Sequence, residues 1–187
     1  ILQPKKVVVN YGNHDLRFQN YLAKNLDTDL LELMPKTSLE LIFVDGFNHY
    51  NKELHTKVHY DPLTDVFKDS GIEIVYNDTW FSFVGETIFV HPLAYSSGML
   101  KTAEKAYRYF KDNDYFFDTI VMAHTHKTGH YDIGNSVIYE QGCCCETSKM
   151  DYADGKLTPS QREGFILVYQ DKFGRLNEDK THIVRLN

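Results

Sequence analysis

The sequence predicts a mixed α/β protein on three observations. The first half of the chain mixes helical periodicity with short β-branched runs, and the last third is mostly strand-like. A length of 187 residues, with 42% hydrophobic and 25% charged residues, is enough for one globular domain with a sizeable core. We therefore predict a single α/β domain over residues 1–187.

The first predicted strand is the valine run of residues 7–9, which suits a strand buried on both faces. It leads into the turn Gly12-Asn13-His14-Asp15, where an amide, an imidazole and a carboxylate follow one another. Gly12 permits a backbone conformation or a close approach that other residues resist. Polar groups at the carboxyl end of such a strand lie where open α/β sheets usually bind ligands, so we expect the chemistry at this turn.

Four helices are predicted by apolar residues at steps of three and four and by start and stop signals. They span residues 16–34, 38–44, 61–71 and 98–112. Asp27 and Asp29 could divide the first helix, and Asp61-Pro62 is a good start for the third. The rest of 36–60 is predicted to be a surface segment without regular structure.

Short β-rich runs bounded by turn residues predict the remaining strands. They span residues 72–76, 80–84, 87–90, 118–123, 130–133, 136–141, 163–170 and 181–186. The helix at 98–112 carries basic residues on one side, and such a stripe is more often a solvated face than a phosphate contact. Its members are Lys101, Lys105, Arg108 and Lys111.

Three of the strands end in histidine, which is the strongest signal in the sequence. The residues are His14, His91 and the pair His124 and His126. Imidazole binds borderline divalent metals well, and an amide or carboxylate oxygen adds a harder ligand, so the set suits Zn, Mn, Fe or Ni. Parallel strands deliver their carboxyl ends to one edge of a sheet, where these side chains can meet.

Structural histidines are the competing interpretation. We expect hydrogen-bonded structural roles for the histidines that lack such a context: His49, His55, His59, His130 and His182. Tyr95, Ser96 and Ser97 are candidates for substrate contact only through their position after His91. The adjacent residues Cys143, Cys144 and Cys145 fit small buried hydrophobes better than soft-metal ligands.

Together the histidine turns resemble a known family. The turn of residues 12–15, His91 and the segment 123–126 are similar, in order and spacing, to the last three motifs of calcineurin-like metallophosphoesterases. Over roughly residues 5–145 the chain also resembles a phage and bacterial subgroup, in which an arginine follows the first motif, as Arg17 does here. The resemblance implies a two-sheet β-sandwich flanked by helices, with two metal ions.

The resemblance also implies a ligand set. Asn13, His91 and His124 would bind the second metal, and His126 would bind the first. The implied cofactors are two divalent ions, Mn, Zn, Fe or Ni, that hold a hydroxide at neutral pH and neutralise charge developing on the phosphoryl group.

Residues of the first turn receive roles from the same resemblance. His14 would protonate the leaving oxygen or stabilise its charge, Asp15 would orient His14, and Arg17 would contact the substrate. The implied reaction is hydrolysis of a phosphate ester, with a phosphodiester slightly favoured and a nucleic acid or nucleotide among the candidate substrates.

Two motifs of the family are missing upstream of Asn13. Family members begin with Asp-x-His and Gly-Asp-x-x-Asp, which supply two ligands of the first metal and the bridging carboxylate. Because the chain also begins with Ile1, we expect the C-terminal part of a longer domain whose N-terminal strands are missing. These 187 residues are then expected to hold at most one ion, weakly, with little or no activity, whereas the complete protein is expected to be active.

Composition limits the cellular compartment and the binding partners that we expect. A net charge of -6 argues against a broad electrostatic grip on nucleic acid or anionic membrane, but not against a phosphate substrate. No apolar run approaches the roughly 20 residues that span a bilayer, and adjacent cysteines cannot staple a fold, so we expect a cytoplasmic protein without a membrane partner. Two rivals stay open: a non-catalytic scaffold of the same fold and a structural zinc site around His91, His124 and His126. The oligomeric state is left open.

Overall fold

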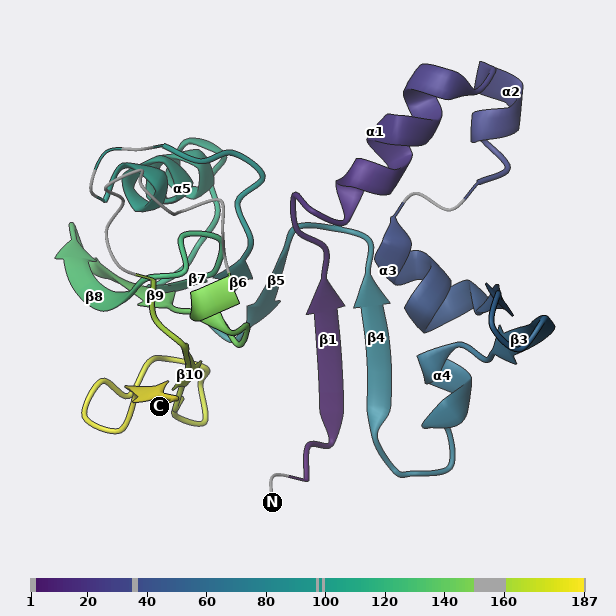
Figure 1. The fold of residues 1–187 in the computed structure, drawn as a ribbon. Helices are drawn as coiled ribbons and strands as arrows, with labels where there is room; N and C mark the ends of the chain where they lie inside the picture. The colour runs from purple at the N-terminus through teal and green to yellow at the C-terminus, as the bar shows by residue number, and fades with distance from the viewer. Residues whose placement is uncertain (1–2, 35–36, 97, 99, 150–160, 187) are drawn as a thin grey trace. The chain divides into compact units, whose positions relative to one another are not determined.

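The computed structural model describes residues 3–34, 37–96, 98, 100–149 and 161–186. The chain divides into two compact units, Ile1–Trp80 and Phe81–Asn187. Both contain strands, and helices occur in each (Figure 1). The mixed α/β class predicted from the sequence is confirmed, whereas the two-sheet sandwich stays a prediction.

The first unit is built around two parallel strands, β1 (Lys6–Asn10) and β4 (Glu73–Asn77). Its other elements are α1 (Leu16–Asn25), α2 (Thr28–Leu31), α3 (Ser38–Glu40), a π-helical turn η1 (Leu41–Asp45), β2 (Phe47–Asn51), β3 (Thr56–Tyr60) and α4 (Leu63–Val66). The two parallel strands lie side by side and end at the same edge (Figure 1). The turn of residues 12–15 therefore leaves the carboxyl edge of this pair.

Two predictions for the first unit were wrong in detail. The valine strand is not buried on both faces, because Val8 is 40% exposed and Val7 and Val9 are only half-buried. The helix predicted for 61–71 is limited to α4, with Pro62 at its N-cap in an extended conformation, and turns follow it. The division of the first helix is confirmed, because the side chain of Asp27 accepts a bond from the backbone N–H of Asp29 and caps α2.

The segment predicted to be irregular contains a β-hairpin. Strands β2 and β3 pair in antiparallel register, and the rings of Phe47 and Tyr60 stack with centroids 5.0 Å apart. All but one of the residues in these strands are exposed. The hairpin was missed because its polar and aromatic residues give no clear apolar alternation.

The second unit is organised around a five-stranded sheet in the order β5-β6-β7-β9-β8. These strands are β5 (Phe81–Val84), β6 (Thr87–Val90), β7 (Thr119–Met122), β8 (Thr128–Ile133) and β9 (Ser136–Gln141). The remaining elements are α5 (Lys101–Asp112), a 3-10 turn η2 (Thr147–Lys149), β10 (Gly164–Leu167) and β11 (His182–Arg185). Strands β6, β7 and β9 are mutually parallel, as the carboxyl-edge prediction requires.

Different elements cover the two faces of this sheet (Figure 1). The helix α5 lies over one face and buries its apolar stripe, including Ala103 and Phe110. On the other face, the buried residues Val121 and Tyr139 pack against Ile166 of β10 and neighbouring apolar side chains. The central strands are thus held from both sides, which gives a rigid base for the residues at their ends.

All the predicted strands are present, with bounds that shift by three residues at most. None of the helices that the structure describes has the length and apolarity needed to span a bilayer.

Candidate functional site

Two of the predicted ligands meet at the carboxyl ends of β6 and β7. The parallel register pairs Val90 with Met122, and the N–H of Ala123 donates to the carbonyl of Val90 at 3.0 Å, so both chains leave the sheet together. His91 and His124 follow directly. Nδ1 of His124 lies 3.2 Å from Nε2 of His91, and the two rings are nearly perpendicular, at 84°.

This separation suits a shared metal ion as well as it suits a hydrogen bond. Two imidazole nitrogens bound to one tetrahedral zinc, each at its usual bond length, would lie about 3.3 Å apart. Within the described part of the chain, no group of three or more His, Cys, Asp or Glu residues is placed to hold an ion. The pair of His91 and His124 is thus the part of the predicted ligand set that the structure brings together in this unit.

The chain turns sharply after this pair. His124 and His126 have φ angles of 77° and 56°, a region that residues other than glycine rarely adopt and that is concentrated at functional sites. Thr125 between them is buried, and its Oγ1 has no hydrogen-bond partner among the described residues. The two histidines are therefore presented by a turn and not by an extended strand.

The loop after His91 brings further polar groups toward His124. The ring of Tyr95 lies 5.9 Å from the ring of His124, measured between centroids. Nζ of Lys105 donates to Oγ of Ser96 at 2.7 Å. Tyr95, Ser96 and Ser97 were candidates for substrate contact. Tyr95 lies beside His124, Ser96 is bonded to Lys105, and Ser97 lies outside the described residues.

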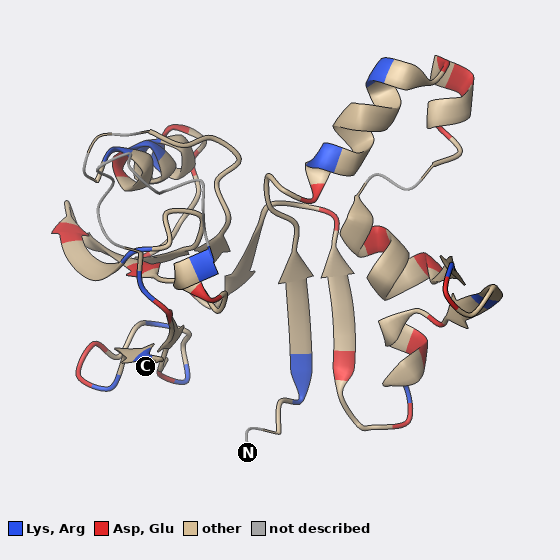
Figure 2. Cartoon of the chain, viewed as in Figure 1, with Lys and Arg blue, Asp and Glu red and all other residues tan. Residues whose placement is uncertain are grey.

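Basic residues recur along α5 (Figure 2), and two of them, Lys101 and Arg108, pair with Glu104 on the same helix. Glu104 accepts from Lys101 and from Arg108, at 2.8 Å in each case. These pairs hold the pKa of the Glu104 carboxyl below its usual value, Lys101 being the larger cause. The interpretation of this stripe as a solvated, ion-paired face fits the structure for these residues.

In the first unit, the turn after β1 is closed by Asp15. Its Oδ2 accepts from the N–H of Gly12 at 2.7 Å, and its own N–H donates to the Gly12 carbonyl at 3.1 Å. The carboxylate thus holds the turn that carries Asn13 and His14. Asp15 acts here on the backbone of the turn, and the role that the resemblance implies for it, orienting His14, stays a prediction.

His14 is exposed and faces Arg17. The Nη2 atom of Arg17 lies 3.2 Å from Nε2 of His14. Because a guanidinium can only donate, Nε2 of His14 is the acceptor and its proton is on Nδ1. The predicted acid, in the turn before α1, and the predicted substrate contact, in the first turn of α1, are therefore neighbours.

Sequence reasoning missed an amide cluster at the same edge. Nδ2 of Asn77, the last residue of β4, donates to Oδ1 of Asn10 and to Oγ1 of Thr79, at 2.9 Å in both cases. Asn10 and Asn77 each follow a predicted strand, which was a possible sign of a polar site. The sequence did not show that these two strands pair in parallel and bring the amides together.

The predicted residues fall into two sets, one on each unit. Asn13, His14, Asp15 and Arg17 belong to the first unit, and His91, His124 and His126 belong to the second. Within the sets, the structure joins His14 to Arg17 and His91 to His124.

The three cysteines do not form a ligand cluster. Cys143 is buried, and burial raises the pKa of its thiol, whereas Cys144 and Cys145 are exposed. The prediction of three small buried hydrophobes holds for Cys143 and is wrong for the other two, because the chain leaves the sheet after β9.

Comparisons with known proteins add little to this geometry. No family model matches the chain, and no curated protein matches it. Among solved structures, a single mutant of Vps29 from Entamoeba histolytica is similar, with a TM-score of 0.31 and 14% sequence identity over 62% of this chain and 69% of that chain. A likeness of this extent does not establish a family, so the functional argument depends on the residues themselves.

Proposed function

We propose that this protein hydrolyses a phosphate ester, preferentially a phosphodiester, with divalent metal ions held at the strand ends. The observation that carries the proposal is the 3.2 Å approach of the ring nitrogens of His91 and His124 at the carboxyl ends of neighbouring parallel strands. Two imidazole nitrogens at that separation suit a shared metal ion. The left-handed backbone conformation of His124 is of the kind that concentrates at functional sites.

The proposed ligands on the second unit are His91 and His124 for one ion and His126 for another, as the metallophosphoesterase resemblance implies. When bound, the metal pair supplies a nucleophilic hydroxide at neutral pH and neutralises charge on the phosphoryl oxygens.

Residues of the first turn would handle the leaving group and the substrate. His14 is exposed, and in its imidazolium form it would donate a proton to a leaving oxygen and become neutral. Arg17 would contact a phosphoryl oxygen, because a guanidinium matches phosphate with parallel hydrogen bonds. Asp15 is a positioning residue, since its bond to the N–H of Gly12 fixes the turn.

Metal binding tests the first part of the proposal. Titration of the purified protein with Zn²⁺ or Mn²⁺ in a calorimeter is expected to show a bound ion, and binding should be lost in His91→Ala and in His124→Ala. His130→Ala is the matched control, because this histidine is exposed on β8 and packs on Tyr139. Unchanged binding in both test variants would overturn the ligand assignment.

Replacement of His14 tests the chemistry. In protein that hydrolyses bis(p-nitrophenyl) phosphate, His14→Ala is expected to lower turnover by about 100- to 10,000-fold, with metal content retained. His55→Ala, an exposed histidine on the β2–β3 hairpin, should leave turnover unchanged. A non-catalytic scaffold predicts no turnover with any metal, and a structural zinc site predicts that chelation unfolds the protein without any turnover to lose.

A further inference from the structure

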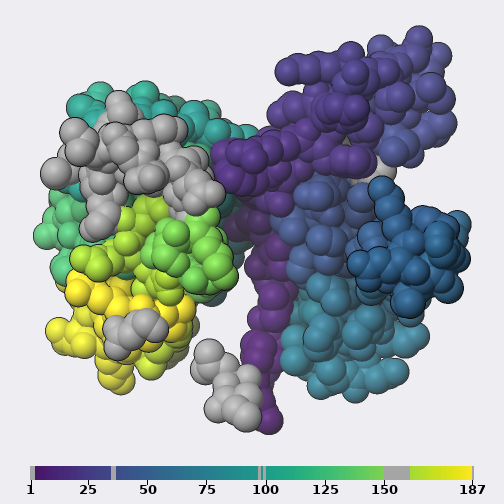
Figure 3. All heavy atoms as spheres, in the orientation of Figure 1, coloured from purple at the N-terminus to yellow at the C-terminus, as the bar shows by residue number. Residues whose placement is uncertain are grey.

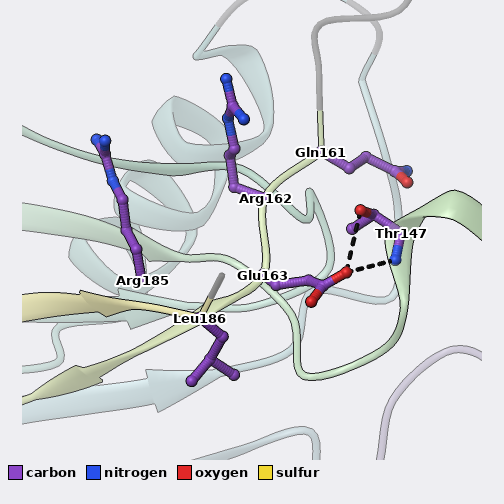
Figure 4. Close-up of a pocket in the computed structure, with 6 residues that line it drawn as sticks. All are labelled: Thr147, Gln161, Arg162, Glu163, Arg185 and Leu186. Carbon is purple, nitrogen blue, oxygen red and sulfur yellow. Dashed lines mark hydrogen bonds between the residues drawn. The ribbon is translucent and has the colours of Figure 1, made fainter.

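A pocket in the second unit is bordered by two arginines. It has a volume of about 410 Å³. Its lining residues come from the segment before β10, from the end of β11 and from η2 (Figure 4): Thr147, Gln161, Arg162, Glu163, Arg185 and Leu186. No sequence pattern connects these residues, which the pairing of β10 with β11 brings together.

The acid in this pocket is already engaged. Oε1 of Glu163 accepts from the N–H of Thr147 at 2.8 Å and from its Oγ1 at 3.2 Å. Figure 4 shows the side chains of Arg162 and Arg185 extending away from this carboxylate. Among the residues that the structure describes, no ion pair involves either arginine. Two exposed guanidiniums without an ion pair in the described part of the chain stand against one carboxylate here, so the lining has a net positive charge that suits an anion.

The backbone of Arg162 is attached to the candidate metal turn. Its N–H donates to the carbonyl of His126 at 2.8 Å, and its carbonyl accepts from the N–H of Cys143 at 3.1 Å. The adjacent Glu163 is held in turn, because its carbonyl accepts from the N–H of Leu186 at 3.0 Å. The segment that carries Arg162 is therefore fixed directly beside one of the proposed ligands.

We propose that this pocket binds a second phosphate group of the substrate, so that the preferred substrate carries at least two phosphates in a chain, as an oligonucleotide does. The inference rests on the proposed phosphoesterase function. Guanidiniums bind phosphate oxygens with two parallel hydrogen bonds, and Arg162 and Arg185 supply two such groups. A small groove of this kind is compatible with the net charge of -6, because it needs only a local positive field.

The test is direct binding without metal. Fluorescence anisotropy with a labelled oligothymidylate of four nucleotides, in excess EDTA, is expected to show binding that Arg162→Ala and Arg185→Ala each weaken by about 3- to 10-fold. The slope of log affinity against log salt should become shallower by about 0.7 for each cation removed. Arg162→Lys should keep the salt slope but lose affinity, because a lysine retains the charge without the bidentate geometry.

A matched control is available on the same unit. Arg175 is exposed and lies 3.8 Å from the carboxylate of Glu86, outside the pocket, so Arg175→Ala should leave binding unchanged. Equal effects of all three alanine substitutions would overturn the proposal, as would competition by inorganic phosphate as strong as that by unlabelled oligothymidylate. The binding assay contains no metal and measures no turnover, so its result does not depend on whether the protein hydrolyses a phosphate ester. If the hydrolysis test fails but binding still depends on the two arginines, the pocket is an anion site without a catalytic role.

Discussion

Tyr131 on β8 carries a hydroxyl that is buried and has no hydrogen-bond partner among the described residues. Burial raises the pKa of this phenol strongly, and the negative charge of Glu140 adds to the effect. Glu140 is itself 5% exposed and lies on the neighbouring strand β9. A polar atom is therefore desolvated here without a compensating bond, which costs about 1–3 kcal/mol.

Removal of that hydroxyl is expected to stabilise the protein. Tyr131→Phe should raise the free energy of unfolding at pH 7 by about 1 kcal/mol, because the aromatic ring is kept and the unpaired polar atom is lost. Urea unfolding followed by circular dichroism measures the change. Tyr21→Phe is the control, since Tyr21 is 66% exposed and its hydroxyl stays in water. A loss of stability in Tyr131→Phe would show that the hydroxyl has a partner, such as an ordered water.

The same residue predicts a pH dependence. An unfolded tyrosine titrates near its ordinary pKa of 10.0, whereas the native pKa of Tyr131 lies higher, so the native state holds more protons between the two values. Stability is therefore fully present below about pH 10 and falls as the pH rises toward the native pKa. Relative to the wild type, Tyr131→Phe should lose less stability above pH 10, and identical slopes for the two proteins would contradict this assignment.

At the scale of elements, local periodicity was enough to find every described strand except β2 and β3, and to place the histidines at the strand ends. His91 and His124 were predicted as neighbours because each follows an apolar run, and parallel pairing of those runs brings them together. Arg162 was not found, because its place depends on pairing with His126 and Cys143, far away in the sequence. Such nonlocal pairing leaves no periodic trace in the residues that take part.

The junction of β9 with the segment of Arg162 depends on Gly142. This residue has a φ of +86°, and a methyl group on it would lie 2.8 Å from the carbonyl oxygen of Arg162 and 2.9 Å from Cγ2 of Thr128. Gly142→Ala is expected to lower the free energy of unfolding by about 2 kcal/mol or more, through backbone strain and overpacking. It should also weaken oligothymidylate binding, because the clash displaces the segment that carries Arg162.

A glycine on the adjacent strand supplies the comparison for that experiment. A methyl group added to Gly129 on β8 would have no described atom within 4 Å, and the φ of this glycine is not positive. Gly129→Ala should therefore change stability by less than about 1 kcal/mol. Chemical denaturation of both variants checks the pair, and equal losses would mean that the close approach at Gly142 does not constrain this junction.

At the scale of the whole molecule, the buried apolar side chains are distributed unequally. Those that the structure describes all belong to the second unit, from Ile88 to Cys143. In the first unit, neither α1 nor α2 has a buried residue, and Leu33 after them is 80% exposed. Figure 3 shows these two helices, in dark purple, with much of their surface open on the face in view. Few buried contacts hold α1 and α2, so their local stability should be low.

Native-state hydrogen exchange should show this difference directly. Amides of β6, β7 and β9 are expected to exchange only through large openings of the second unit, because these strands are hydrogen-bonded on both sides within a covered sheet. Amides of α1 and α2 should exchange at least about 100-fold faster after correction for intrinsic rates, since opening them exposes little new apolar surface. The paired amides of β1 and β4 serve as the reference within the first unit. Protection of α1 equal to that of β7, measured by mass spectrometry or NMR, would show that contacts beyond those of its own unit stabilise this helix.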